Sequence, residues 1–116
     1  MERVCFQLQV DPTRLDEYTE RHAAVWPDML RAIEASGRRN YSLFLGDGGM
    51  LIGYYETDDD VAAQAYLAAS DVAARWEAEM SQFFIGLDGR PDQAATALTE
   101  VFHLEDQLAT AESENQ

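Results

Sequence analysis

The sequence predicts a single α+β domain in which helices cover one face of an antiparallel sheet. Three observations support this fold class. Apolar residues alternate near the N-terminus, two strand-like runs flank a glycine-rich turn, and two segments carry apolar residues at helical spacing. The resulting order of strand, helix, two strands, helix and strand is the ferredoxin-like βαββαβ arrangement. With 116 residues, the chain can enclose one hydrophobic core but not two.

Four strands are predicted. The first covers residues 3–10, where every second residue is apolar. Residues 40–45 and 50–56 form a hairpin around Gly46-Asp47-Gly48-Gly49, and residues 98–104 form the last strand. The glycine-rich turn is not expected to bind phosphate, because no helix begins after it and the chain contains no lysine.

The predicted helices have recognisable starts and stops. Asp11 and Pro12 supply an N-cap and a proline at the first helical position. Pro27 must interrupt the helix that follows, because proline has no N–H and its ring collides with the carbonyl four residues earlier. Gly37 is expected to end the second piece. The acidic run 58–60 favours the positive end of the next helix and needs no bound ion. The predicted helices span 12–24, 27–36, 61–69 and 71–80.

Two further features concern surfaces. Cys5, Gln7 and Gln9 lie opposite the apolar set of the first strand, on a face with too little charge to be wholly exposed. A second copy of the chain is the simplest cover, so we expect a homodimer. Residues 1–104 are predicted to form the domain, and residues 105–116 an acidic, polar, solvated tail without a basic residue.

Charge and composition exclude several functional classes. The chain has 22 Asp and Glu against 8 Arg and no Lys, a net charge of −14, so nucleic acid and anionic membrane are not expected partners. Without lysine, Schiff-base and pyridoxal-phosphate chemistry are excluded. Cys5 is the only cysteine, and no signal peptide or membrane-spanning run is recognisable, which indicates a cytoplasmic protein.

Metal and cofactor chemistry are not predicted either. The cysteine and the two histidines, at positions 5, 22 and 103, lie on separate predicted elements and match no metal-ligand spacing. No nucleophile motif is present. Acid–base catalysis therefore remains as the candidate chemistry of this chain.

Four residues are candidates for such chemistry, each with an ordinary structural alternative. Tyr18 and His22 are four residues apart and share a helical face. His22 is either a satisfied core histidine or a general acid in a pocket, since free imidazole has a pKa of about 6.5. Trp76 is either a core aromatic or a flat surface for a sugar. Tyr41 is either an ordinary strand tyrosine or a phenol pointing into the same cavity.

Several segments taken together resemble the L-rhamnose mutarotase family. They are FQLQVDPTRLDEYTERHAAVWPDM, NYSLFL, SDVAARWEAEM and EVFHL, and the resemblance extends over residues 6–104. The combination of Tyr-x-x-x-His-x-x-x-Trp-Pro with a later Asn-Tyr and Asp-Val-x-x-Arg-Trp is far more constrained than any single motif.

The resemblance implies a dimeric α/β barrel of ferredoxin-like protomers and a cofactor-free interconversion of the anomers of L-rhamnose or a related deoxy-sugar. It also implies that His22 is the proton donor and that Tyr18, Tyr41 and Trp76 bind the sugar. Glu77 stands where the family pattern has a second Trp, so hydrogen bonds replace a stacking face. We therefore take Glu77 as a sugar-binding candidate and as the candidate base. The acidic surface suits a small neutral sugar and disfavours a sugar phosphate.

Two alternatives stay open at this point. The same fold supports cofactor-independent monooxygenases and lactone isomerases, in which a small dimeric barrel encloses an apolar substrate. The chain could also be a non-catalytic ligand-binding or dimerisation module, in which His22 would be structural.

Overall fold

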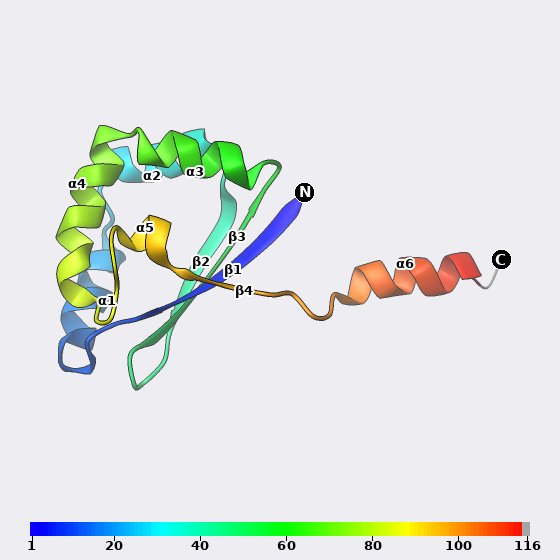
Figure 1. The fold of residues 1–116 in the computed structure, drawn as a ribbon, viewed down its shortest axis with the longest axis horizontal. Coiled ribbons are helices and arrows are strands. Elements are labelled where there is room, and N and C mark those ends of the chain that lie inside the picture. Colours follow the sequence, from blue (N-terminus) through cyan, green and yellow to red (C-terminus); the bar gives the residue numbers. More distant parts are fainter. Residues whose placement is uncertain (115–116) are drawn as a thin grey trace.

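The computed structural model describes residues 1–114 and contains one four-stranded antiparallel sheet, with helices α1 to α5 gathered on one side of it (Figure 1). The strands lie in the order β2-β3-β1-β4. This is the ferredoxin-like order, so the predicted fold class is confirmed. The elements are β1 (Glu2–Gln9), α1 (Leu15–Ala23), α2 (Pro27–Ser36), β2 (Arg39–Leu45), β3 (Met50–Thr57), α3 (Asp60–Ala68), α4 (Asp71–Met80), α5 (Pro91–Ala94), β4 (Thr96–Leu98) and α6 (Leu104–Glu114), with 3-10 turns at Pro12–Arg14 and Ser81–Phe83.

β1 lies in the middle of the sheet because both of its edges are paired. It pairs with β3 along all 8 of its residues, and with β4 only through residues 5–7. Successive side chains of a strand point to opposite faces. Val4, Phe6 and Leu8 accordingly face the helices, as the alternation in the sequence predicts.

Local capping sets several helix boundaries: the predicted start at Pro27 and stop at Gly37 are confirmed, whereas α1 begins three residues later than predicted, after a 3-10 turn. The Asp11 carboxylate accepts a hydrogen bond of 2.9 Å from the backbone N–H two residues later and opens the turn before α1. α2 begins at Pro27 and ends at Ser36, and the following Gly37 has a φ of 96°, the left-handed conformation that favours glycine. The side chains of Asp59 and Ser70 cap α3 and α4.

The last strand is shorter and lies earlier than predicted, so the expectation of a strand over residues 98–104 is wrong. β4 covers only Thr96–Leu98, and the chain then leaves the edge of β1. Side chains hold it there: the Arg3 guanidinium donates to the carboxylates of Glu100 and Asp106 at 2.9 Å. Apolar alternation alone could not show that these residues are tied to β1 by ion pairs.

The acidic tail predicted from residue 105 forms the helix α6 as far as residue 114, and residues 105–113 are exposed; residues 115–116 lie outside the described part. The division of the chain at residue 104 stays a prediction. Leu, Ala and Glu favour helix, and Glu105 and Asp106 stand at its positive end. Figure 1 shows α6 at the end of an arm that projects away from the sheet; the arm comprises residues 99–114, which follow β4. The radius of gyration, 16.2 Å, accordingly exceeds the value of about 13 Å typical of a compact domain of this length.

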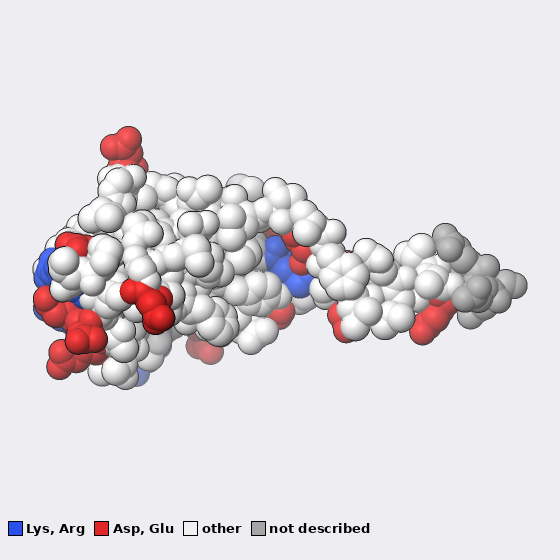
Figure 2. Space-filling view, turned by 90° about the horizontal axis from the view of Figure 1, so that it is seen from below, with Lys and Arg blue, Asp and Glu red and all other residues white. Residues whose placement is uncertain are grey.

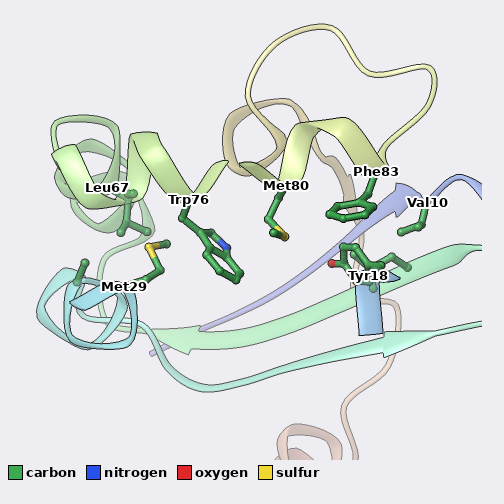
Figure 3. Packing of buried hydrophobic residues seen from close by; sticks show 10 residues of the cluster. Val10, Tyr18, Met29, Leu67, Trp76, Met80 and Phe83 are labelled. Carbon is green, nitrogen blue, oxygen red and sulfur yellow. The ribbon is translucent and has the colours of Figure 1, made fainter. Parts of the chain in front are cut away.

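The hydrophobic core fills the space between the helices and the sheet. Figure 3 shows Trp76 and Met80 pointing from α4 toward the strands, with Phe83 above Tyr18. The spacing of the α4 pair agrees with the predicted apolar face. The fully enclosed members of the core are Val10, Leu51, Tyr55, Ala63, Leu67, Ala73 and Phe83.

Phe6 lies on the sheet in a space that only a glycine leaves open. Gly53 is its partner on β3, and a Cβ at that position would overlap the Phe6 ring. The ring contacts two tyrosines, with centroid distances of 6.2 Å to both Tyr41 and Tyr55. The glycine therefore allows an aromatic floor between the sheet and the helices.

Gly53→Ala is expected to destabilise the protein by about 1–3 kcal/mol, because the added methyl group forces Phe6 out of its position. Urea unfolding measures the change. Gly48→Ala is the matched control, since a Cβ there meets nothing within 4 Å. Equal unfolding midpoints for the two variants would show that the Phe6 ring moves at no cost.

Candidate functional site

A cavity of about 510 Å³ lies between the sheet and the helices. Its volume is in the range of small-molecule binding sites. The strands β1, β2 and β3 form its floor, and α1, α2 and α4 form walls. The residues predicted for the site all line it, from three separate elements: Tyr18 and His22 on α1, Tyr41 on β2, and Trp76 and Glu77 on α4. Their chemical roles stay predictions.

His22 is held by a hydrogen bond that distinguishes its two ring nitrogens. The ring stacks on Tyr18 with centroids 4.2 Å apart, and Nδ1 lies 3.0 Å from the Tyr18 carbonyl oxygen. Because a carbonyl can only accept, we assign the proton of the neutral ring to Nδ1, which leaves Nε2 free for a ligand. Burial lowers the pKa of His22, and the bond to the carbonyl opposes that effect.

The two tryptophans form an edge-to-face pair of unequal exposure. Trp76 is 6% exposed and lines the cavity, whereas Trp26 is 38% exposed, and their ring centroids lie 5.0 Å apart. Trp76 also meets the His22 ring at 5.5 Å and 79°. The imidazole therefore contacts both the Trp76 indole and the Tyr18 ring.

Tyr18 and Tyr41 present neutral phenols to the cavity. Burial raises the pKa of both hydroxyls well above their ordinary value, and the nearby carboxylate of Glu77 adds to the effect. A neutral phenol can both donate and accept a hydrogen bond. Such groups suit sugar hydroxyls.

Glu77 is a buried carboxyl group on the cavity wall. Its side chain belongs to a residue only 8% exposed, and burial raises its pKa to about 7, with the Asp92 carboxylate acting in the same direction. Arg90 partly opposes the effect, but it is engaged elsewhere, donating to Asp92 at 2.9 and 2.6 Å. Glu77 can therefore exchange a proton near neutral pH.

Sequence reasoning missed six polar residues of the cavity, namely Arg38, Tyr55, Asp60, Gln64, Asp92 and Gln93. Tyr55 donates a hydrogen bond of 2.6 Å to Asp60, and the Arg38 guanidinium lies 4.2 Å above the Tyr55 ring. The alternation of β3 was a usable signal for Tyr55, which stands two residues after Gly53 on the inner face. No sequence signal separated Arg38 from its neighbour Arg39.

Groupings that would hold a metal ion are absent among residues 1–114: no three His, Cys, Asp or Glu side chains come together in that way. None of the described helices is long and apolar enough to cross a lipid bilayer. The longest has 11 residues, whereas a span needs about 20.

Glu77→Gln should stabilise the folded protein at neutral pH. The unfolded chain releases the Glu77 proton near the ordinary pKa of 4.5, while the folded protein keeps it until about 7, so wild-type stability falls between these values. The variant should gain up to about 3 kcal/mol over wild type at pH 8 and almost nothing at pH 4.

Urea unfolding at several pH values measures this difference. Glu20→Gln, on the exposed face of α1, is the control and should show no such pH-dependent gain. A constant difference between Glu77→Gln and wild type across the pH range would contradict the raised pKa.

Comparisons with known proteins identify the family. A model described as L-rhamnose mutarotase matches residues 3–104. An L-rhamnose mutarotase from Burkholderia cenocepacia (strain HI2424) is 38% identical over 107 residues, which cover 90% of this chain and 100% of the relative.

Solved structures agree on the fold. The crystal structure of L-rhamnose mutarotase FA22100 from Formosa agariphila has a TM-score of 0.71 at 24% identity, covering 89% of this chain and 98% of that one. An antibiotic biosynthesis monooxygenase has a TM-score of 0.59 at 17% identity, covering 88% of this chain and 100% of that one, which is a likeness of fold alone. The family match and the sequence relatives together show that the chain belongs to the L-rhamnose mutarotase family.

Proposed function

We propose that this protein interconverts the α and β anomers of L-rhamnose or a related deoxy-sugar. The observation that carries the proposal is the convergence of His22 and Glu77, two groups able to exchange protons, on one cavity with Tyr18, Tyr41 and Trp76. Membership of the family supports the substrate. The proposed activity is an isomerisation in which no atom is gained or lost.

The reaction needs one acid and one base. Ring opening breaks the bond between C1 and the ring oxygen, which takes up a proton, while the anomeric hydroxyl gives up its proton and becomes the aldehyde oxygen. Rotation about the C1–C2 bond and reclosure yield the other anomer. A positioned acid or base of this kind typically contributes about 10²–10⁴-fold in rate. In our proposal His22 protonates the ring oxygen through Nε2, and Glu77 takes the hydroxyl proton.

The two groups share a single proton in this mechanism. Ring opening of either anomer starts from the form in which His22 is protonated and Glu77 is ionised. Reclosure of the ring returns both protons and restores this form. Burial lowers the pKa of His22 and raises that of Glu77 to about 7, and both shifts favour the form that holds the proton on Glu77 over this working form.

The remaining lining residues suit a neutral deoxy-sugar. The Tyr18 and Tyr41 phenols can hold hydroxyls, and the Trp76 indole offers a flat apolar surface to the C–H side of the ring. Met29, Ile33 and Leu67 also line the cavity and supply an apolar wall for a methyl group; they are buried or half-buried. A sugar phosphate is disfavoured, because Asp60, Glu77 and Asp92 outnumber the one arginine among the lining residues.

The monooxygenase and lactone-isomerase alternatives rest on the shared fold alone. A non-catalytic binding module would hold a sugar without accelerating its anomer exchange. A measurement of anomer exchange therefore distinguishes a binding module from the proposed enzyme.

His22→Asn should abolish the acceleration of L-rhamnose anomer exchange, lowering the enzymatic rate by about 10²–10⁴-fold, because the amide cannot carry a proton to the ring oxygen. One-dimensional NMR saturation transfer at neutral pH measures the exchange. His103→Asn is the matched control, since that histidine pairs with Glu105 and Asp106 away from the cavity.

The same assay tests the base: Glu77→Gln should lose activity to a similar degree. Fast exchange in the folded His22 variant would remove His22 as the donor, and unchanged exchange in the Glu77 variant would remove Glu77 as the base. No exchange in the wild type would overturn the proposed function.

We further propose that the protein acts as a homodimer whose interface includes the sheet face turned away from the helices. Phe44 on β2 is 63% exposed there, and its partner Ile52 lies on the same face. The arm adds Val101 and Phe102, which are 90% and 61% exposed, and it stands free of the body in Figure 2. Exposed apolar surface on neighbouring elements is typical of an interaction site.

We place the dimer in the cytoplasm, where an unpaired cysteine such as Cys5 stays reduced.

Sedimentation velocity should give a species of twice 13.0 kDa for the wild type and a folded monomer for Phe44→Asp, because the new charge would be buried between copies. Tyr66→Asp, at a 47% exposed position on α3, is the control and should remain dimeric. A monomeric wild type, or a Phe44 variant that dimerises normally, would contradict this interface.

A further inference from the structure

Arg38 is a buried cation without the partners that such a group needs. The residue is only 5% exposed, and its Nε has no hydrogen-bond partner in the described part of the chain. The nearest carboxylate oxygen, on Asp60, lies 3.9 Å from Nη2, which is too far for a hydrogen bond. A buried charge without hydrogen-bonded partners is costly. Arg90, by contrast, donates to Asp92 at 2.9 and 2.6 Å.

The backbone is shaped to bring this side chain to the cavity. In a regular strand, residues at every second position share a face, so Arg39 rather than Arg38 would accompany Tyr41. The register of β2 against β3 shifts between Arg39 and Ser42, and Asn40 has a φ of 50°. This irregularity turns Arg38 and Tyr41 to the same inner side, and both line the cavity. Bulges that redirect a side chain in this way occur next to active sites.

Arg38 also has a prepared setting. Its guanidinium lies 4.2 Å above the Tyr55 ring, and the Tyr55 hydroxyl donates to Asp60 at 2.6 Å. The ring fixes the plane of the guanidinium, and the hydrogen bond fixes the carboxylate beside it. Donors and an acceptor are thus held side by side on the cavity wall.

This group lies toward the opposite end of β1 from Tyr18. Tyr55 pairs with Val4 near the start of β1, whereas Tyr18 contacts Phe84, which pairs with Val10 just beyond its end. A ligand that contacts both ends is held along the cavity.

We propose that Arg38 and Asp60 form a second sugar-binding subsite, which holds a hydroxyl or a vicinal diol of the substrate on the side remote from Tyr18. The inference rests on the proposed function, since it assumes a sugar in this cavity. Arg38 donates a hydrogen bond to the hydroxyl oxygen, and the Asp60 carboxylate accepts a hydrogen bond from the hydroxyl. The subsite would determine which hydroxyl configuration is accepted, because a sugar lacking that hydroxyl leaves the guanidinium unpaired.

A hydroxyl fits this pair better than a carboxylate. Asp60, Glu77 and Asp92 all line the same cavity, and a further negative charge would be repelled. A hydroxyl carries no charge and can both accept from Arg38 and donate to Asp60. The expected ligand is therefore a neutral polyhydroxy compound rather than a sugar acid.

Arg38→Met tests the subsite, with Arg39→Met as the matched control, because Arg39 is exposed and pairs with Asp58 outside the cavity. Titration calorimetry with L-rhamnose should show a Kd about 10- to 100-fold higher for Arg38→Met, the loss expected for hydrogen bonds from a charged donor. The control should bind like wild type. The melting temperature of Arg38→Met should stay the same or rise, because a buried charge without a hydrogen-bonded carboxylate is removed and Asp60 keeps its bond to Tyr55.

Unchanged affinity in Arg38→Met would overturn the inference, and a lower melting temperature with normal affinity would assign Arg38 a purely structural role. D-glucuronate is the second ligand: tighter wild-type binding than L-rhamnose, lost in Arg38→Met, would mean that the subsite selects a carboxylate and would also overturn it. If Arg38→Met does not fold, Asp60→Ala decides, because alanine offers no acceptor and normal affinity there would exclude the pair.

The saturation-transfer assay on the same samples separates the two proposals. If the wild type exchanges L-rhamnose anomers and Arg38→Met binds L-rhamnose with the same affinity, the subsite is refuted and the proposed function stands. A wild type that neither binds nor exchanges L-rhamnose refutes the proposed function and the subsite with it.

Discussion

The placement of the Phe6 ring over Gly53 is the contact on which the site depends. Phe6 lies on the central strand, and its ring supports Tyr41 and Tyr55, which contact each other at 5.2 Å. Tyr55 in turn supports the Arg38 guanidinium. A side chain at position 53 would displace the Phe6 ring. Because Gly53 has no Cβ, the aromatic rings can pack on the centre of the sheet.

The cavity concentrates groups that lower stability. Glu77 keeps a proton that the unfolded chain would release, and Arg38 remains buried without a hydrogen-bonded carboxylate. Neither arrangement helps folding, since apolar residues of the same volume would be tolerated at least as well. Unfavourable arrangements of this kind concentrate at functional sites, where a ligand or a reaction makes use of them.

The sequence allowed prediction of those elements whose causes are local. The helix boundaries around Pro27 and Gly37 follow from the chemistry of one or two residues, and the inner face of β1 follows from simple alternation. The family pattern likewise identified five residues that the fold brings to one cavity. Arg38 could not be predicted, because the bulge that turns it inward depends on the pairing of β2 with β3. The end of β4 and the start of α6 were missed for a similar reason: ion pairs with Arg3, remote in sequence, direct the chain there.

These ion pairs give the arm a different physical character from the rest of the molecule. Arg3 binds Glu100 and Asp106 where their side chains are 43% and 67% exposed, and charged groups gather at the base of the arm in Figure 2. Interactions between exposed charges weaken as ions accumulate around them, with a Debye length of about 8 Å at physiological ionic strength. Enclosed contacts such as that between Tyr18 and Phe83 are scarcely screened. The direction of the arm is therefore sensitive to the salt content of the surroundings, whereas the shape of the cavity is not.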